Sequence, residues 1–419
     1  MAKKVEIKEK EIDAPYELPE GWTWVRLGDV CKFENGYAFK SDNFSDKGTP
    51  VIRITNIKEN TVDLESCVFT SESNIDNRFC VLDGDLLIAM SGATTGKTGV
   101  FKGAQIAYLN QRVGNIKIID KTILCEQFRN YYIQEQEQTI LLNAYGGAQP
   151  NISSNKICEM YFPLPPIDEQ QRIVNLIESM FAKLDEAKEK AQNVVDSFET
   201  RKAAILHKAF TGQLKIDNGE LSIEDWEEKS FSDLGTSNLG KMLDANKNTG
   251  DEIRYLRNIN VRWFDFDLSD LLTMRAKPEE IKKLSVKKGD LFICEGGEPG
   301  RCAVWKDENS DLIFQKAIHR FRPNDGVSSE FVAYVLYYYN QIGKLSDYFT
   351  GTTIKHLTGQ SLAKIPIRIP PLNYQLSIVN FLDTILEKES RAKEAAQTVL
   401  EQIALLKKSI LARAFRGDL

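Results

Sequence analysis

The nine residues from Ser91 to Gly99 read SGATTGKTG and follow the apolar run GDLLIAM. Glycines beside a Gly-Lys-Thr triplet are typical of loops that bind phosphate through backbone N–H groups. The Walker A pattern GxxxxGK[ST] requires a glycine where this chain has Ser91, so Gly92 leaves the loop one residue short. A phosphate loop must also begin a helix, whereas the following residues 99–111, GVFKGAQIAYLNQ, predict another strand. The pattern therefore argues against an NTPase.

The sequence carries no other recognisable catalytic constellation. Its three histidines, His207, His319 and His356, form neither an HxxxH pair nor a nucleophile–base pair by spacing. No GxSxG motif occurs, and the seven cysteines never form a CxxC pair. We therefore expect a non-catalytic chain with no metal site and no cofactor of its own, in a reducing cytoplasm.

The composition is that of a multidomain globular protein. A chain of 419 residues is too long for one ordinary hydrophobic core. It has no apolar run of about 18 residues, which predicts no membrane-spanning helix, and its charged start MAKKVEIKEKEID does not resemble a secretory signal. The net charge of −6 does not favour nucleic-acid binding, because domains that bind nucleic acid are typically basic. It does not exclude such binding either, since a local basic patch or a partner subunit can supply a positive field.

One half of the chain repeats the other. Residues 163–214 align with residues 368–419 without a gap, at a constant offset of 205 positions, and roughly twenty positions are identical. Weaker matches precede these segments, namely TPVIRITNI (49–57) with EIRYLRNINV (252–261), GDLLIAMSGATTGKTGVF (84–101) with GDLFICEGGEPGRCAVW (289–305), and YGGAQPNIS (145–153) with FTGTTIKHLT (349–358). We therefore expect two diverged halves related by an internal pseudo-two-fold axis.

Each strongly repeated segment predicts a long helix that begins at a Pro-Pro pair. Apolar or small residues recur in alternating steps of four and three, the spacing of a heptad seam, over about 33 residues or ~50 Å. The seam residues are Ile173, Ile177, Met180, Leu184, Ala187, Ala191, Val194, Phe198 and Ile205 in the first helix, and Ile378, Leu382, Ile385, Ala392, Ala396, Val399, Ile403, Leu406 and Ile410 in the second. Arg201 and Glu389 interrupt them. We expect an antiparallel coiled coil; the alternative is two unrelated surface helices, each packed on its own domain.

The remaining segments predict mixed α/β domains. Short β-branched runs such as VIRITNI, GDLLIAM and NIKII, and IRYLRNINV, GDLFICE and IHRFRP, alternate with turns. Residues 126–142 and 329–345 each predict one helix, with aromatic residues facing the core. The fold class is therefore mixed α/β, with two globular domains separated by two long helices. We place the first domain at 1–162, the first long helix at 163–214, the second domain at 215–367 and the second long helix at 368–419.

Motifs along almost the whole chain carry a family resemblance. They are LPEGWTWVRLGDV (18–30), GYAFKSDNF (36–44), GDLLIAMSG (84–92), LPPIDEQQRIVNLIE (164–178), RKAAILHKAFTGQL (201–214) and LLKKSILARAFRGDL (405–419). Together they resemble the specificity subunit of Type I restriction–modification systems. One departure is that Asn373 and Tyr374 stand where the first helix has Asp168 and Glu169, which makes partner contacts at the second helix the less typical ones.

The resemblance implies a division of labour. Each globular domain would be a target recognition domain that reads one half of a bipartite, asymmetric sequence in double-stranded DNA, and the coiled coil would fix the distance between the halves. Two modification (methyltransferase) subunits would dock on the chain, joined by translocating restriction subunits. Adenine methylation, S-adenosylmethionine, ATP and Mg²⁺ would belong to those partners, and no membrane would be involved.

Polar residues on corresponding loops of the two halves are the candidate DNA contacts, because base edges are read by hydrogen bonds and phosphates by cations. Glu295 and Glu298 could accept hydrogen bonds from cytosine N4. The full set is Lys40, Arg53, Thr55, Asn56, Ser91, Thr94, Lys97, Gln111, Arg112 and Gln149 in the first half, and Arg257, Asn258, Asn260, Glu295, Glu298, Arg301, Lys316, Arg320, Thr352, Thr353 and Lys355 in the second.

Two other classes of function stay open at the level of sequence. One is a coiled-coil interaction scaffold whose paired domains bind protein or another ligand without DNA specificity. The other is a self-sufficient enzyme such as an NTPase, in which Lys97 would be needed for nucleotide turnover.

Overall fold

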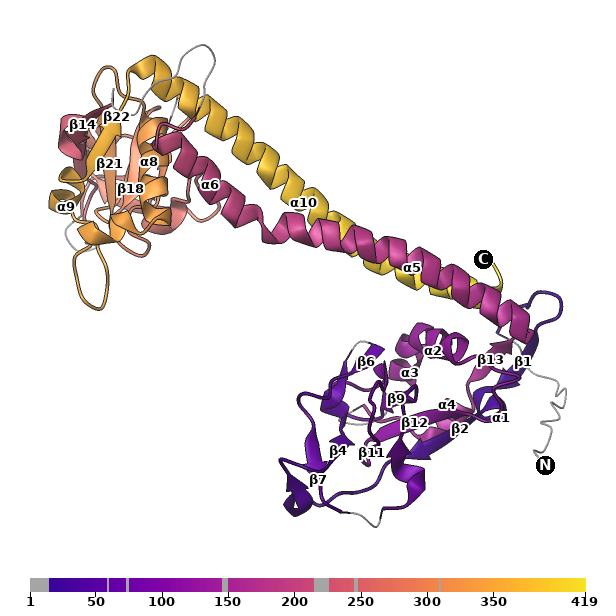
Figure 1. Ribbon diagram of the computed structural model, residues 1–419. Helices are drawn as coiled ribbons and strands as arrows, with labels where there is room; N and C mark the ends of the chain where they lie inside the picture. Colours follow the sequence, from indigo (N-terminus) through magenta and orange to yellow (C-terminus); the bar gives the residue numbers. More distant parts are fainter. Residues whose placement is uncertain are drawn as a thin grey trace. The chain divides into compact units, whose positions relative to one another are not determined.

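A computed structural model describes residues 15–58, 60–72, 75–144, 150–214, 226–244, 248–308 and 310–419. The chain divides into two compact units. Unit 1 comprises residues 1–191 and 398–419, and unit 2 comprises residues 192–397. Two helices, α5 (Ile167–Asp196) and α10 (Leu372–Arg416), are continuous through the boundary between the units (Figure 1).

Unit 1 contains two main sheets and a short two-stranded one. The first sheet has the order β2-β12-β9-β10-β6-β5, the second β3-β7-β4-β11-β8, and the third pairs β1 with β13. The strands are β1 (Thr23–Arg26), β2 (Cys31–Asn35), β3 (Phe44–Ser45), β4 (Thr49–Ile52), β5 (Ile57–Lys58), β6 (Asn60–Val62), β7 (Val68–Thr70), β8 (Cys80–Val81), β9 (Leu86–Ala89), β10 (Thr98–Val100), β11 (Ala107–Leu109), β12 (Val113–Ile118) and β13 (Tyr161–Leu164). The helices before α5 are α1 (Leu27–Val30), α2 (Glu126–Glu135), α3 (Glu137–Ala144) and α4 (Ser154–Cys158).

Unit 2 repeats this architecture. Its sheets have the orders β15-β21-β18-β19, β17-β16-β20 and β14-β22. The strands are β14 (Glu227–Ser230), β15 (Gly235–Leu239), β16 (Asp251–Leu256), β17 (Leu272–Ala276), β18 (Leu291–Cys294), β19 (Cys302–Val304), β20 (Leu312–Phe314), β21 (Ile318–Pro323) and β22 (Pro366–Ile369). The helices are α6 (Phe198–Phe210), α7 (Pro278–Leu284), α8 (Ser329–Gln341) and α9 (Gly359–Ala363), together with the first part of α10.

The strand orders correspond between the units. The series β2-β12-β9-β10 matches β15-β21-β18-β19, and β7-β4-β11 matches β17-β16-β20, with antiparallel and parallel pairs in the same places. The mixed α/β class predicted from the sequence is confirmed, as is the presence of two repeated domains.

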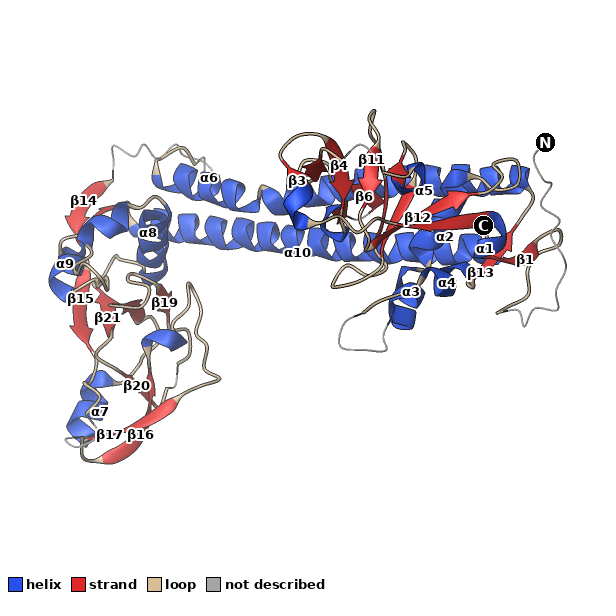
Figure 2. Ribbon diagram, turned by 90° about the horizontal axis from the view of Figure 1, so that it is seen from below, coloured by secondary structure: helices blue, strands red, loops and turns tan. Residues whose placement is uncertain are grey.

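A fully buried strand lies at the centre of each unit because both of its faces are covered. In β9, Leu86 and Ile88 pack with residues of α2 and α3, whereas Leu87 and Ala89 pack with the second sheet. In β18, Leu291 and Ile293 pack with α8, and the alternate residues pack with β16 and β20. Figure 2 shows β16, β17 and α7 at the end of unit 2 away from α8. The tyrosines of α8 are buried, as predicted.

Two sequence runs do not stay extended as predicted. The strands β4 and β16 end at Ile52 and Leu256, and short 3₁₀ turns follow at Ile54–Asn56 and Asn258–Asn260. In each turn a buried asparagine side chain accepts a hydrogen bond from the backbone N–H three residues earlier, which closes the turn in place of a strand ladder.

Matching glutamines attach the start of each long helix to its domain. Gln170 accepts a hydrogen bond from the Cys125 N–H at 2.8 Å and donates to the carbonyls of Ile123 and Pro165, both at 2.8 Å. Gln375 makes the same three kinds of bond, to Ser328 N–H and to the carbonyls of Gly326 and Pro370. Both side chains are buried. The helices themselves begin directly after the Pro-Pro pairs, as predicted.

The first predicted helix is two consecutive helices, α5 and α6, that meet at Ser197. The Ser197 hydroxyl donates back to the Asn193 carbonyl and also accepts a hydrogen bond from Arg201. A serine that bonds to the carbonyl four residues earlier competes with the regular ladder and bends a helix, which accounts for the interruption.

The helix α10 lies antiparallel to α5 within unit 1 and antiparallel to α6 within unit 2. In unit 1, Lys407 is 2.5 Å from Asp185 of α5, and in unit 2, Arg201 of α6 is 2.8 Å from Glu389. The two residues that interrupt the predicted seams are therefore partners in an ion pair.

Part of the predicted seam of α10 was wrong. Ala392, Val399 and Leu406 are exposed, and the half-buried positions lie one residue later, at Lys393, Leu400 and Lys407. The Lys393 ammonium lies 4.4 Å from the centre of the Phe198 ring, and the Lys407 ammonium lies 4.8 Å from that of Phe181. Lysine stems can cover apolar surface while the charged end stays near water, so these two seam positions carry a charge that a search for apolar residues passes over.

The structure has no helix long and apolar enough to span a membrane within the ranges that it describes.

Candidate nucleic-acid interface

The segment SGATTGKTG closes a hairpin between β9 and β10. The N–H of Gly96 donates to the Ala89 carbonyl at 2.9 Å, and both the N–H and the hydroxyl of Thr95 donate to the Gly92 carbonyl. Gly92 and Gly96 have φ angles of 82° and 87°, which favour glycine. The N–H groups of Thr95, Gly96 and Lys97 are thus bonded within the hairpin, and a strand follows it instead of a helix.

Two further segments of unit 1 meet the start of this hairpin through the backbone, and one of them is bonded in turn to the end of β4. The Met90 N–H donates to the Arg112 carbonyl at 3.0 Å, and the Ile152 N–H donates to the Met90 carbonyl at 2.9 Å. The Asn110 N–H donates to the Ile52 carbonyl at 3.0 Å. Because these bonds lie at the ends of the segments, the candidate residues that follow them gather at one end of the sheets.

The same bonds recur in unit 2. The Glu295 N–H donates to the Ala317 carbonyl at 3.0 Å, and the Leu357 N–H donates to the Glu295 carbonyl at 2.7 Å. The Gln315 N–H donates to the Leu256 carbonyl at 3.0 Å. Each partner follows its unit 1 counterpart by 204 or 205 positions. The two units therefore present equivalent sets of loops with different side chains.

The turns that carry Arg53 and Arg257 are superimposable in their local geometry. The φ and ψ angles are −107° and 166° at Arg53, and −106° and 163° at Arg257. The Oδ1 atom of Asn56 or Asn260 accepts the arginine N–H at 2.9 Å in both. A duplicated turn thus sets the direction in which each arginine leaves the backbone.

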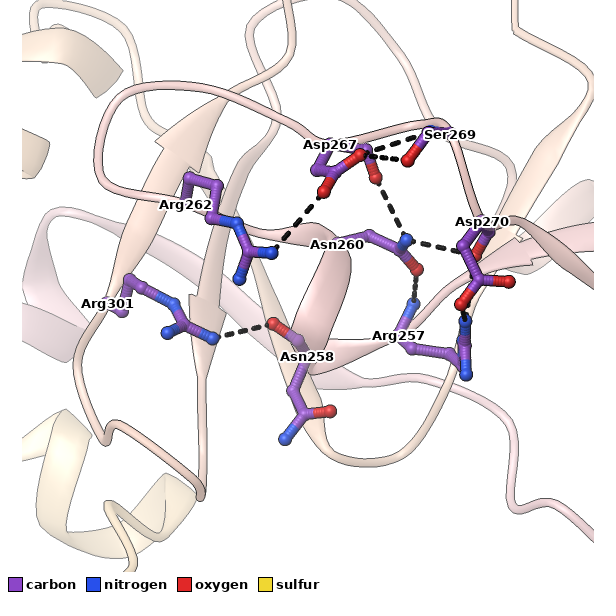
Figure 3. Close-up of polar contacts among 8 residues, drawn as sticks. All are labelled: Arg257, Asn258, Asn260, Arg262, Asp267, Ser269, Asp270 and Arg301. Carbon is purple, nitrogen blue, oxygen red and sulfur yellow. Dashed lines mark hydrogen bonds and ion pairs between the residues drawn. The ribbon is translucent and has the colours of Figure 1, made fainter. Parts of the chain in front are cut away.

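The amides of Asn56 and Asn260 are used within these loops. The Asn260 Nδ2 atom donates to the carbonyls of Asp267 at 2.9 Å and Asp270 at 3.2 Å (Figure 3). The Asn56 Nδ2 atom donates to the Asp63 carbonyl at 3.3 Å and to the Ser66 hydroxyl at 3.1 Å. Both asparagines are buried, so their side chains hold the loops and are not presented to DNA.

Three arginines of unit 2, Arg257, Arg262 and Arg301, lie close together around Asn258 (Figure 3). Arg257 is 2.6 Å from Asp270, and Arg262 is 3.3 Å from Asp267. Arg301 donates to the Asn258 carbonyl at 2.9 Å and is 2.7 Å from Glu298. This cluster is a concentration of guanidinium groups at the loop end of the unit.

The candidate residues fall into four groups by exposure. Exposed side chains are Lys40, Thr55, Gln111, Arg112, Glu298, Lys316, Thr352, Thr353 and Lys355. Half-buried side chains are Arg53, Ser91, Thr94, Lys97, Arg257, Asn258, Glu295 and Arg301. Buried side chains are Asn56, Asn260 and Arg320. Gln149 lies outside the described residues.

Arg320 is a structural residue and not a loop residue. It lies on β21, donates to the carbonyls of Lys283 and Ser285, and stacks its guanidinium 5.2 Å from the centre of the Phe314 ring. The residue is 5% exposed, which leaves it inaccessible to DNA in this structure. Its charge had identified it in the sequence, but the strand directs it inward.

Lys40 belongs to none of the loops joined by the backbone bonds described above. It follows Tyr37 by three residues. The Tyr37 N–H donates to the Leu109 carbonyl at 2.8 Å, which brings this segment beside the end of β11. In unit 2 the exposed residues Thr352 and Lys355 lie on a small loop closed by a pair of backbone bonds between Thr350 and His356.

The sequence pattern missed Arg262, Asp267 and Asp270. In the repeat these residues correspond to Lys58, Asp63 and Ser66, each 204 positions earlier. Extending the alignment of the two halves through this loop would therefore have identified them. Hydrogen bonds from Ser269 and the nearby Arg262 lower the pKa of the Asp267 carboxyl, which keeps it ionised beside the arginine cluster.

Burial shifts the pKa of two groups near the loop ends, Cys294 and His319. Burial raises the pKa of the Cys294 thiol, at the end of β18, to about 11, so the thiolate is scarce near neutral pH. Burial also lowers the pKa of His319, whose ring lies 2.9 Å from the Leu357 carbonyl. No group of three or more potential metal ligands occurs within the described ranges.

Comparisons with known proteins place the chain in a family. The sequence model of the Type I restriction modification DNA specificity domain matches residues 19–196 and again residues 223–402. The chain is 23% identical to the Type I restriction enzyme EcoBI specificity subunit of Escherichia coli, over 99% of this chain and 90% of that protein. It is 20% identical to the EcoKI specificity subunit of Escherichia coli strain K12, over 96% of this chain and 90% of that one.

A solved structure shares the fold. The crystal structure of the HsdS subunit from Thermoanaerobacter tengcongensis matches with a TM-score of 0.67 and 20% identity, covering 97% of this chain and 99% of that one. Two copies of the specificity domain therefore account for most of the sequence and for its duplicated architecture. The chain belongs to the family of Type I restriction–modification DNA specificity subunits.

Proposed function

We propose that each unit is a target recognition domain that reads one half of a bipartite, asymmetric DNA site. The observation that carries this proposal is one loop framework built twice with different side chains. Lys97 and Thr94 in unit 1 correspond to Arg301 and Glu298 in unit 2, at matching places in the same hairpin. A shared framework supplies equivalent docking, and different side chains supply different base contacts.

The long helices act in this proposal as the spacer between the two half-sites. The antiparallel ion pairs inside each unit support a coiled coil of α5 and α6 with α10. We keep the division into a first domain at 1–162, a first long helix at 163–214, a second domain at 215–367 and a second long helix at 368–419. A seam of ~50 Å places the two readers about one to one and a half turns of B-DNA apart, at about 34 Å per turn.

The chain recognises DNA within a larger enzyme and performs no chemistry itself. Two modification subunits and the restriction subunits supply adenine methylation, DNA translocation and cleavage in the cytoplasm. S-adenosylmethionine, ATP and Mg²⁺ bind to those partners. The poor nucleophiles and the internally bonded SGATTGKTG loop support this assignment.

Genome-wide mapping of methylated adenines tests the proposal. Cells with the modification subunits are compared with and without this chain, and methylation at one bipartite sequence is expected only when the chain is present. Binding of the purified complex to that duplex in competition with random DNA provides the second measurement. If no duplex competes better than random DNA in any subunit combination, the chain is an interaction scaffold and the proposal fails.

Lys97→Ala separates DNA recognition from the NTPase alternative. We expect DNA binding to weaken by about three- to tenfold, because one cation near the phosphates is lost. The purified chain is expected to show no nucleotide turnover before or after the substitution. Nucleotide hydrolysis by the wild-type chain that disappears in the variant contradicts this expectation.

A further inference from the structure

Equivalent cations in the two units have different electrostatic surroundings. Arg53 corresponds to Arg257 and Lys97 to Arg301, each 204 positions apart. In unit 2 both arginines face carboxylates, Asp270 at 2.6 Å and Glu298 at 2.7 Å. The unit 1 residues that correspond to these two acids are neutral.

Ser66 occupies the place of Asp270, and Thr94 occupies the place of Glu298. Ser66 preserves the loop contact, because its hydroxyl accepts from the Asn56 amide as the Asp270 carbonyl accepts from Asn260. The acidic charge is therefore absent while the framework is retained. Of the four corresponding positions, unit 1 carries two cations and no acid, whereas unit 2 carries two of each.

The cations of unit 1 are available for a ligand. Across the described part of the chain, neither the terminal nitrogens of Arg53 nor the Lys97 ammonium makes a hydrogen bond or ion pair. The Nε atoms of Arg53, Arg257 and Arg301 are alike shielded from water without a partner, so the difference between the units lies in the terminal nitrogens. Arg301, by contrast, uses both terminal nitrogens, on Glu298 and on the Asn258 carbonyl. A phosphate reaching Arg301 must displace a carboxylate that already satisfies it.

We infer that the acids at positions 270 and 298 restrain unit 2 from binding the DNA backbone, so that unit 1 supplies the stronger sequence-independent attachment. This inference rests on the proposed DNA-recognition function. An arginine paired with a neighbouring carboxylate offers little net charge to a phosphate, so binding by unit 2 depends more on matching bases. The two acids thus lower the affinity of unit 2 for DNA of any sequence and make its binding depend more on the bases of its half-site.

Neutral isosteres provide the decisive variant. Asp270→Asn with Glu298→Gln removes both charges. Each amide keeps one acceptor oxygen, for Arg257 at position 270 and, at position 298, for either Arg301 or the Trp263 N–H, which bond to different oxygens of Glu298. Affinity of the complex with modification subunits for a random duplex is measured by fluorescence anisotropy over a range of salt concentrations. We expect about tenfold tighter binding near 0.1 M salt and a salt slope steeper by about one to two, since each new phosphate contact adds roughly 0.9 to the slope.

The chain provides a control with the same change in charge. Asp311→Asn with Glu308→Gln neutralises two acids of unit 2 that pair with Arg254 and Lys288, both at 2.6 Å, away from the arginine cluster. This double variant is expected to change affinity by less than about twofold, because exposed pairs remote from the loops contribute little. An equal effect of the two double variants overturns the inference.

The reciprocal substitution adds an acid to unit 1. Ser66→Asp is expected to weaken binding to random DNA by about threefold to fivefold and to lower the salt slope by about one. Methylation mapping with Asp270→Asn and Glu298→Gln should show relaxed sequence at one half-site only. If the wild-type complex selects its target but these variants leave affinity, slope and selectivity unchanged, the inference fails while the proposed function stands. If the wild-type complex selects no duplex, the proposed function fails first and the inference falls with it.

Discussion

Single side chains decide how each domain holds its long helix. Gln170 and Gln375 lie 205 positions apart, are buried, and each satisfies one N–H and two carbonyls of a loop and a Pro-Pro segment. A glutamine amide is suited to this task because it carries both a donor group and an acceptor. The role is invisible in a heptad analysis, where a glutamine at the start of a helix reads as a surface residue.

Gln170→Ala is expected to destabilise unit 1 by about 2–4 kcal/mol, because it leaves three buried backbone groups without partners. Hydrogen exchange read by mass spectrometry should show lost protection around residues 123–128 and at the start of α5, with unit 2 unchanged. Gln171→Ala, at the exposed neighbour, is the control and should cost less than about 0.5 kcal/mol. Equal effects of the two substitutions contradict the role assigned to Gln170.

His319 gives unit 2 a dependence on pH. Its ring is buried and bonded to the Leu357 carbonyl, and burial lowers its pKa below that of the unfolded chain. The unfolded state therefore binds the proton first, so stability is lost as pH falls below about 6.5, by up to ~1.4 kcal/mol per pH unit. Urea unfolding of wild type and His319→Asn between pH 7.5 and 5 should show a smaller loss in the variant. If the free energy of unfolding falls equally with pH in the two proteins, His319 is not the source of the pH dependence.

At the scale of elements, the helices pair through a seam that is only partly apolar. Arg201 and Glu389 meet across unit 2, and the repeat places Leu406 and Leu184 at the corresponding positions of unit 1. Lys393 and Lys407 cover aromatic rings on the facing helices. Polar residues in a seam specify register at a cost in stability, so we assign the Arg201–Glu389 pair to alignment of the helices.

A double-mutant cycle tests this pair. Arg201→Leu or Glu389→Leu alone is expected to destabilise unit 2 by about 1 kcal/mol, because each leaves a partly buried charge without its partner. The double substitution should cost less than either single one, because neither charge is then left without its partner. The exposed pair of Arg391 with Glu387 is the control, with a coupling energy below about 0.5 kcal/mol in urea unfolding.

At the scale of the whole molecule, duplication is the organising feature. Strand orders, loop bonds, the arginine turns and the buried glutamines all recur at an offset of 204 or 205 residues. Recurrence of the framework with divergence of the loops supports independent recognition of two half-sites by the two units. The divergence includes charge, as at positions 66 and 270, where a serine corresponds to an aspartate.

Exchange of the first domain is the corresponding prediction. Replacing residues 15–160 by the first domain of another family member is expected to change one half of the methylated sequence and leave the other half unaltered. Methylated-adenine mapping in cells with the modification subunits measures the outcome. Changes in both halves, or in neither, contradict independent reading by the two units.

The sequence alone determined the duplication, the start of each long helix after a Pro-Pro pair, the strands at GDLLIAM and GDLFICE and the failure of SGATTGKTG as a phosphate loop. These depend on local periodicity, on glycine and proline positions and on the repeat offset, all of which can be read along the chain. Only the tertiary structure decided which polar loop residues are free. Asn56 and Arg320 turn inward, Lys393 covers a ring, and Arg257 meets Asp270 while Arg53 meets no acid among the described residues. The reason is that a polar side chain takes the partner that folding brings near it, and that partner comes from another loop or strand.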